Sequence, residues 1–213
     1  MSMDEHDVAY ERYMSDLYEE HYHEAIEEFT DELLISYYTD NKLLAKPAIN
    51  SLCEARKLEG ANPTAVFILA AIAVEVGLKV TLLKPIIFGL VHDNSVASLI
   101  TDLTVSHPAM KKYQQLLLRV LDQHGGVNIE KIIREGSDKT LWDEIKEVKE
   151  LRNLIMHRAE KASIANADLA LGVASTILEK VFPDVVAKMG LHLHNDFQIC
   201  DDFKCKLKSA QDK

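Results

Sequence analysis

Residues 141–160 read LWDEIKEVKELRNLIMHRAE, and this stretch decides the fold class. Apolar side chains recur in it at alternating steps of four and three residues, which is the spacing of one face of an α-helix. The positions on that face are Leu141, Ile145, Val148, Arg152, Ile155, Ala159 and Ala162. All of them except Arg152 are apolar, so the pattern predicts an amphipathic helix from about Thr140 to Ala162 with one buried face.

The segments before this helix also carry helical signals. Residues 4–40 repeat apolar side chains at helical spacing among Glu and Asp residues, which predicts one long acidic helix. Pro47 fits the first turn of a second helix, which Gly60 would close. Residues 64–84 form the most apolar helix, and Pro85 is expected to end or kink it because proline lacks the backbone N–H that a helix uses.

The segments that follow the apolar helix are shorter. The pattern predicts a short helix through Ile100, a helix over residues 108–124 that stops at two glycines, and a polar, loop-rich stretch at residues 128–139. The last substantial helix covers about residues 163–181, and we expect it to break at Pro183.

These segments together predict an all-α fold, a helical bundle of about four to five core helices with an extra long N-terminal helix. The chain has 213 residues but only eight glycines and five prolines, so its uninterrupted segments suit helices better than short strands. We divide it into an acidic N-terminal helical extension (1–44), a helical bundle (45–190) and a polar, loosely packed C-terminal tail (191–213).

The formal net charge of -10 opposes non-specific binding to nucleic-acid phosphates, so a role on RNA must rest on a local basic site. The N-terminus lacks the layout of a signal peptide, and three widely separated cysteines are typical of reduced thiols. The apolar stretch 65–91 contains Glu75, Lys79 and Lys84. We therefore expect a buried bundle helix, no membrane span and a cytoplasmic location.

Arg152 lies in the middle of the apolar face of the helix at 141–160. A guanidinium stays charged, so burying it requires a carboxylate, a phosphate or water. Asn153 and His157 are four residues apart and share a face beside it. Arg152 and His157 point about 140° apart around the helix and lie roughly 7.5 Å apart along its axis. They can flank a groove, but they meet in one pocket only with local bending or a second subunit.

The segment LRNLIMH (residues 151–157) resembles the signature of HEPN domains (higher eukaryotes and prokaryotes nucleotide-binding). That signature is an Arg, often followed by a polar residue such as Asn, and then a His after four to six intervening residues, on a late helix of an all-α bundle. The wider resemblance covers about residues 45–190 and rests on helix order. Arg119 and His124 repeat the spacing, but their helix ends at the glycine pair 125–126 and no polar residue follows Arg119.

The resemblance implies an activity. In that family, Arg and His side chains of two subunits commonly meet across a dimer interface and cleave RNA without a metal. It thus implies a metal-independent endoribonuclease acting as a homodimer, in a toxin, phage-defence or stress-response system with a regulatory or antitoxin protein as partner. His157 would act as base or acid, Arg152 would stabilise phosphoryl charge, and Asn153 would orient His157 or contact the phosphate. This chemistry needs no cofactor.

Glu75 and Lys79 are the charged residues of the otherwise apolar stretch 65–83, and they lie four residues apart. Glu75 can orient Arg152, which would make the pair supporting residues of the site. The alternative is a solvent-facing stripe on the outside of the bundle.

Two groups of histidines are candidates for metal sites. A di-iron bundle needs Glu-x-x-His on two helices, and Glu20 with His23 supplies the one usable spacing, which argues against such a centre. The C-terminal segment offers two histidines and two cysteines, but their spacing differs from the common zinc-finger patterns. We therefore favour a polar tail with ordinary cysteines and no metal at His192, His194, Cys200 and Cys205.

Two other interpretations stay open. The fold can serve as a non-catalytic HEPN-like scaffold or regulatory protein-interaction module, which the net charge of -10 favours. Alternatively, Arg152 pairs with a carboxylate inside the core and the motif is accidental. An open, positively charged site favours the nuclease, and an open, negatively charged site favours the scaffold. A buried Arg152–Glu75 pair with His157 turned away favours the accidental motif.

Overall fold

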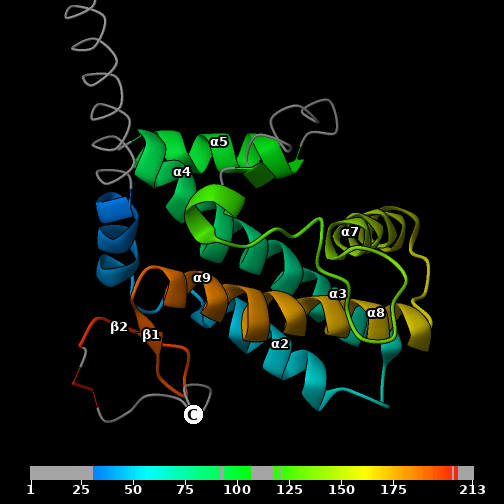
Figure 1. Ribbon diagram of the computed structural model, residues 1–213. Coiled ribbons are helices and arrows are strands. Elements are labelled where there is room, and N and C mark those ends of the chain that lie inside the picture. The colour runs from blue at the N-terminus through cyan, green and yellow to red at the C-terminus, as the bar shows by residue number, and fades with distance from the viewer. Residues whose placement is uncertain (1–30, 92–93, 107–117, 120, 203, 206–213) are drawn as a thin grey trace, which may run out of the picture.

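The computed structural model describes residues 31–91, 94–106, 118–119, 121–202 and 204–205, and it confirms the all-α fold. Residues 31–40 form the described end of the N-terminal helix, and the rest of the expected helix at 4–40 lies outside the described residues. The further elements are α2 (Lys46–Lys57), α3 (Pro63–Val76), η1 (Gly77–Leu83), α4 (Lys84–Val91), α5 (Asn94–Ser106), α7 (Leu141–Arg158), α8 (Ile164–Thr176), η3 (Ile177–Val181), α9 (Phe182–Lys188), β1 (His192–Leu193) and β2 (Ile199–Cys200) (Figure 1).

Two long helical rods form the centre of the bundle, and both continue through a proline at which the sequence predicts a break. The first rod is α3–η1–α4 and contains Pro85, and the second is α8–η3–α9 and contains Pro183. In each rod a π-helical segment directly precedes the helix that carries the proline. The wider π turn makes room for the pyrrolidine ring, which would otherwise clash with the carbonyl four residues earlier. The expected break at Pro183 is therefore wrong, and the helix does not end at Pro85.

A tyrosine completes the hydrogen bonding around Pro85. In an α-helix the carbonyl of Thr81 would accept a hydrogen bond from the N–H of residue 85, which proline lacks. The buried hydroxyl of Tyr38 donates to this carbonyl instead, at 2.8 Å. Burial strongly raises the pKa of Tyr38, and neighbouring Tyr37 raises it further, so the hydroxyl keeps its proton and serves as a donor. This bond also ties the end of the N-terminal helix to the first rod.

The two rods approach each other closely at Gly77, the first residue of η1. A Cβ at this position would lie 3.1 Å from Cδ2 of Leu178 in η3, so the absence of a side chain allows the contact. Arg56 of α2 adds a polar link to the second rod, because its guanidinium donates to both carboxylate oxygens of Glu179, at 2.7 and 2.8 Å. The core thus lies where α2 and the two rods pack together.

The first rod, Pro63–Val91, is the one helix of the described residues that is long and apolar enough to cross a membrane, with a mean hydropathy of 2.3. In its most apolar window 61% of the residues are buried inside the molecule. This burial is what the core helix of a bundle requires, and it agrees with the expected position of residues 65–91.

Helix α7 starts where the sequence predicts and ends earlier. The side chain of Thr140 caps its first turn by accepting a hydrogen bond from the N–H of Asp143. The expected end at Ala162 is wrong, because Ala159 adopts a left-handed conformation (φ 54°) and stops the helix at Arg158. Ala162 is nevertheless buried, and its N–H donates to Thr64 Oγ1 at the start of α3, 3.0 Å away.

Other boundaries differ less. Helix α5 continues to Ser106, beyond the expected end at Ile100. Of the helix expected over residues 108–124, residues 118–119 and 121–125 are described and helical, and Gly126 follows with φ 67°. The polar stretch 128–139 is loop-rich, with one bridge between Ile133 and Thr140.

Residues 191–202 are folded, where the sequence predicts the start of a loosely packed tail. Strands β1 and β2 pair antiparallel, and Leu191, Leu193 and Ile199 are buried against the bundle. The N–H of Ile199 donates to the carbonyl of Lys42 at 3.0 Å, and Nζ of Lys42 lies 3.1 Å from Oδ1 of Asp201. The apolar residues of this short segment are spaced as in a strand, which is why a helical period does not detect them.

Candidate functional site

Helices α3 and α7 contact each other and enclose a pocket of about 180 Å³, which we call the α3–α7 pocket. Its walls are apolar and its rim is charged. The residues around it are Ala71, Val74, Glu75, Leu78, Ile145, Val148, Lys149, Arg152 and Asn153. Four of the five site residues that the sequence predicts, Glu75, Lys79, Arg152 and Asn153, therefore lie in or beside one pocket.

Glu75 lies between two cations at the pocket. Its carboxylate is 3.0 Å from Nζ of Lys79 and 3.6 Å from Nη2 of Arg152. The side chains are 35% exposed at Glu75 and 39% at Arg152, so this is a half-open ion pair and not a buried one. The 3.6 Å separation exceeds hydrogen-bonding distance. Glu75 therefore attracts the Arg152 guanidinium and restrains its direction without accepting a hydrogen bond from its N–H groups.

Lys149 is a further cation at the pocket that the sequence analysis did not select. It lies one turn before Arg152 and Asn153 on the same helix, so the i, i+3, i+4 spacing could have identified it. Burial lowers the pKa of Lys149, Lys79 and Arg152 lower it further, and Glu75 opposes the shift. Lys149 and Arg152 in the pocket and Lys79 beside it therefore lie around one carboxylate, so positive charge is in local excess in an acidic chain.

His157 lies one helical turn beyond Asn153 and outside the lining of this pocket. It is exposed in the last turn of the helix and is not among the residues around the α3–α7 pocket. The neighbouring Met156 lines a second, wider depression of about 630 Å³ between the end of α7 and the start of α3. One chain by itself therefore does not bring His157 to Arg152, as the helix geometry indicates.

Two large apolar side chains are exposed around these residues. Ile72 is 37% exposed, three residues before Glu75 on α3, and Met156 is 59% exposed beside His157 on α7. Single exposed apolar side chains are common on protein surfaces. Here Ile72 and Met156 lie on α3 and α7, close in sequence to Glu75 and His157 respectively.

A buried arginine–carboxylate pair is present in this bundle, but its arginine is Arg134. Its guanidinium donates to both carboxylate oxygens of Glu144, at 2.6 and 2.8 Å, and the Glu144 side chain is only 3% exposed. Ser137 Oγ donates to the same carboxylate at 2.8 Å. The guanidinium also fills the space beside Gly172, where a Cβ would overlap Nη1. This pair fixes the start of α7 against α8.

The duplicated spacing at Arg119 and His124 has a structural role at its histidine. Nδ1 of His124 lies 3.2 Å from Oδ1 of Asp31, so this ring ties the helical turn at residues 121–125 to the N-terminal helix.

Four possible metal ligands lie close together in the C-terminal segment. One donor atom from each lies within 4.8 Å of all the others, and we call this group the hairpin cluster: His192, His194, Cys200 and Cys205. The sequence analysis gave this group little weight because its spacing is unusual. The antiparallel pairing of β1 and β2, which brings the two halves together, was not expected.

No family model matches the chain, and no curated protein or solved structure matches it. The resemblance to HEPN domains therefore rests on the all-α bundle and on the Arg-Asn-x-x-x-His segment itself.

Proposed function

We propose that this protein is a metal-independent endoribonuclease that acts as a homodimer. The observation that carries the proposal is the α3–α7 pocket, where Lys149 and Arg152 lie around Glu75 and Lys79 pairs with the same carboxylate from beside the pocket, in a chain of net charge -10. An anion such as an RNA phosphate is the ligand that this local excess of positive charge favours.

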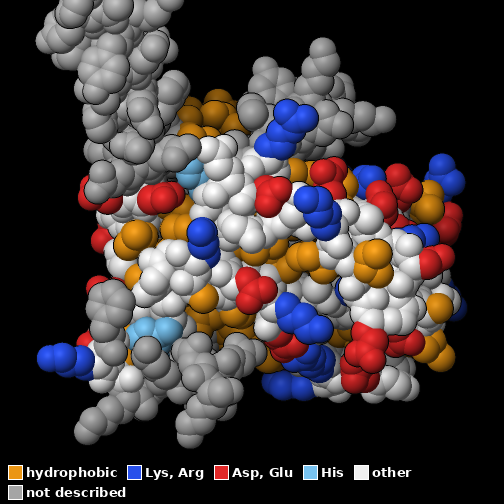
Figure 2. Space-filling view, in the orientation of Figure 1, with side chains coloured by type: hydrophobic (Ala, Val, Ile, Leu, Met, Phe, Trp, Pro, Cys, Tyr) orange, Lys and Arg blue, Asp and Glu red, His pale blue; other side chains and the backbone are white. Residues whose placement is uncertain are grey.

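The charge distribution on the face of the molecule shown in Figure 2 argues for a local site and against a protein that coats RNA. On the face shown in Figure 2, Lys and Arg side chains are interspersed with Asp and Glu side chains. A mixed surface of this kind does not hold a long phosphate backbone, whose binding requires many cations in register. The α3–α7 pocket would instead hold one phosphate and the sugar beside it.

The proposed reaction uses the chemistry of RNA itself. His157 removes the proton of a 2′-hydroxyl, and the oxygen attacks the adjacent phosphorus. The bond from phosphorus to the 5′-oxygen of the next nucleotide breaks, and that oxygen takes up a proton. The products carry a 2′,3′-cyclic phosphate and a 5′-hydroxyl. Arg152 stabilises the charge that develops on the phosphoryl oxygens, and Asn153 positions the phosphate or the His157 ring.

The homodimer supplies what one chain lacks. Because His157 lies outside the α3–α7 pocket, a second copy related by two-fold symmetry would have to bring its own His157 to the Arg152 of the first. Such a contact would also cover Ile72 and Met156, whose exposure in a single chain has an energetic cost. A cytoplasmic enzyme of this kind needs control, which suits a regulatory or antitoxin protein as a further partner.

The test is cleavage of end-labelled transfer and messenger RNA in EDTA, comparing the native protein with His157→Ala. His124→Ala is the matched control, because it removes the histidine of the duplicated Arg-x-x-x-x-His spacing. We expect cleavage by the native protein and by the control, and none by His157→Ala. Because EDTA would also remove a metal from the hairpin cluster, circular dichroism must show that each protein stays folded under assay conditions.

Two results would contradict the proposal. Cleavage that is equal in His157→Ala and in the native protein would remove the assigned base. No cleavage by a native protein shown to be dimeric would favour the non-catalytic interaction module, in which the α3–α7 pocket binds an acidic group of a partner protein.

A further inference from the structure

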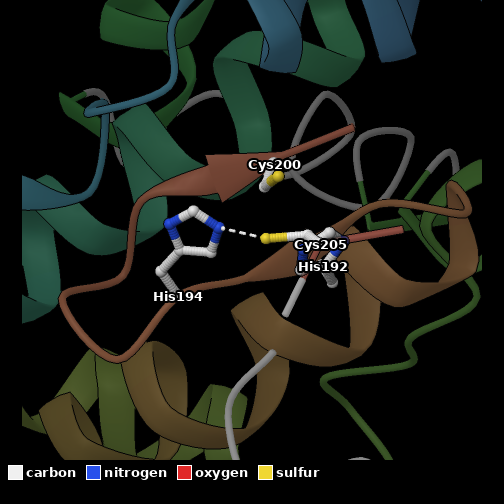
Figure 3. A group of neighbouring side chains, drawn as sticks. All are labelled: His192, His194, Cys200 and Cys205. Atoms are coloured by element: carbon white, nitrogen blue, oxygen red, sulfur yellow. Dashed lines mark hydrogen bonds between the residues drawn. The ribbon is translucent and has the colours of Figure 1, made fainter. Parts of the chain in front are cut away.

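The hairpin cluster brings together donors of two chemical kinds, two imidazoles and two thiols. Figure 3 shows the side chains converging between the strands, with the His194 ring directed at Cys205. Nε2 of His194 and Sγ of Cys205 are 3.3 Å apart, and the rings of His192 and His194 are 5.7 Å apart between centroids. All four side chains are half-buried, and Nε2 of His192 is fully buried.

The backbone explains why these donors meet. His192 lies directly opposite Cys200 in the β1–β2 register, so their side chains share one face of the hairpin. His194 is two residues beyond His192 and returns to the same face. The connection reverses tightly, because His194 N–H donates to the carbonyl of Gln198 at 2.9 Å and Phe197 adopts a positive φ of 61°.

Cys205 reaches the cluster through a second turn. The side chain of Asp202 accepts a hydrogen bond from the N–H of Lys204 at 2.9 Å, and the carbonyl of Asp202 accepts one from Cys205 at 3.0 Å. This turn reverses the chain after β2 and returns Cys205 toward His194. Each of the four donors is thus placed by a backbone hydrogen bond or by strand pairing.

The spacing of the donors fits a small tetrahedral ion. Zinc binds sulfur at about 2.3 Å and imidazole nitrogen at about 2.0–2.1 Å, so neighbouring ligand atoms in a tetrahedron lie about 3.3–3.8 Å apart. The observed contact of 3.3 Å between His194 and Cys205 already falls in this range, and the widest donor separation of 4.8 Å needs only small side-chain rotations. Mixed imidazole and thiolate donors in a tetrahedral arrangement favour zinc over magnesium or calcium.

We propose that this hairpin is a zinc site that binds one Zn²⁺ ion through His192, His194, Cys200 and Cys205. Four protein ligands fill a tetrahedral zinc ion and leave no position for water or substrate, which makes the site structural. The ion replaces the two thiol protons, so two thiolates and Zn²⁺ form a neutral centre that can stay half-buried.

The zinc ion would hold the C-terminal hairpin in the conformation that packs against the bundle. The hairpin contacts α9, and β2 is bonded to the carbonyl of Lys42 in the loop before α2. Closing this short segment around a metal restricts the unfolded chain and adds the binding free energy to the folded state. This role is independent of the proposed ribonuclease activity, because α3 and α7 contribute no ligand.

The test uses the full chain, freed of metal under reducing conditions and then titrated with Zn²⁺ against a chromophoric chelator. We expect one ion per chain, and Co²⁺ in its place should show the strong thiolate charge-transfer bands of tetrahedral sulfur ligation. Cys200→Ser and Cys205→Ser should each weaken zinc binding by more than the roughly 10–100-fold that loss of an outer partner causes. The exposed Cys53 on α2 is the matched control, and Cys53→Ser should bind zinc as the native chain does.

A second measurement needs no variant and therefore cannot fail through misfolding. Alkylation of the native chain, followed by mass spectrometry, reports each cysteine separately. Zinc should slow the alkylation of Cys200 and Cys205 and leave Cys53 unchanged. The proposal is overturned if the reduced chain binds no stoichiometric zinc, if Cys53→Ser weakens binding as much as Cys200→Ser does, or if zinc protects none of the three thiols.

Discussion

The α3–α7 pocket and the hairpin cluster differ in what defines each of them. The pocket carries a short motif at helical spacing, and its charged groups stay spread over two helices, half-exposed and partly paired. The hairpin cluster has no common motif, yet its four donors converge within 4.8 Å. Helix α7, which forms one wall of the pocket, and the β1–β2 hairpin lie far apart in the view of Figure 1. A motif at helical spacing can be found in the sequence, but it does not guarantee that its side chains contact one another. A hairpin brings side chains into contact, but their spacing in the sequence matches no common pattern.

The largest expected effect separates the two regions by function. His157→Ala should reduce RNA cleavage by about 10²–10⁴-fold, the usual contribution of a general acid or base, and leave zinc affinity unchanged. Cys200→Ser should have the opposite pattern: it should weaken zinc binding strongly while the folded protein still cleaves RNA. Cleavage rates and zinc titrations on the same two preparations make the comparison. A loss of both properties in either variant would mean that the regions are coupled.

A large effect on stability is expected at the pair that holds α7. Arg134→Met leaves the buried carboxylate of Glu144 without its cation, which should lower the free energy of unfolding by about 3–5 kcal/mol. Urea denaturation measures the change. Arg56→Met, which removes the half-exposed pair with Glu179, is the control and should cost much less. Equal losses in the two variants would contradict the special role of burial at Glu144.

A smaller effect is expected where the first rod passes Pro85. Tyr38→Phe removes the hydroxyl that donates to the Thr81 carbonyl and leaves that buried acceptor unsatisfied. The free energy of unfolding should fall by about 1–3 kcal/mol, with no change in helix content by circular dichroism. If the urea concentration at the unfolding midpoint is the same in Tyr38→Phe and the native protein, another donor satisfies the Thr81 carbonyl.

The smallest effect concerns the charge of the α3–α7 pocket. Lys149→Met should weaken binding of single-stranded RNA modestly and reduce the slope of log affinity against log salt by about 0.7. Fluorescence anisotropy at several salt concentrations gives both values. Lys46→Met, a substitution on α2 outside the residues around the pocket, is the control and should leave the slope unchanged.

The lowered pKa of Lys149 adds a pH dependence with a definite sign. Below its ordinary pKa of 10.5 the unfolded chain keeps the proton, whereas the folded chain releases it at a lower pH because burial disfavours the charge. Between the two pKa values the unfolded state binds more protons, so stability rises with pH in that window. Lys149→Met should remove this rise, and a native-like rise in the variant would contradict the assignment.

The sequence predicts the helical architecture well because apolar periodicity over long segments needs no knowledge of the tertiary structure. It fails at Pro85 and Pro183, where a π turn before each proline lets the rod continue, and at Ala159, whose left-handed backbone ends α7 early. These are local backbone solutions that depend on packing from other elements, such as the Tyr38 hydroxyl.

The candidate site residues divide in the same way, into those that helical periodicity predicts and those that depend on tertiary packing. Helical spacing places Arg152 and Asn153 on α7, but Glu75 joins them only because α3 packs against α7. Lys149 was not selected from the sequence, and the hairpin cluster was considered and given little weight, for different reasons. Lys149 is an ordinary surface residue until α3 covers part of it, and the cluster depends on the register of two short strands.

The measurement that tests the central claim most directly is a mixing experiment with Arg152→Ala and His157→Ala, each inactive alone. If the site joins Arg152 of one copy to His157 of the other, a mixed dimer contains one intact site. Random exchange of subunits should then restore about one quarter of the native cleavage, since half of the dimers are mixed and each has one of two sites. No restored cleavage, with subunit exchange verified by a size-tagged variant, would contradict a site shared between two copies.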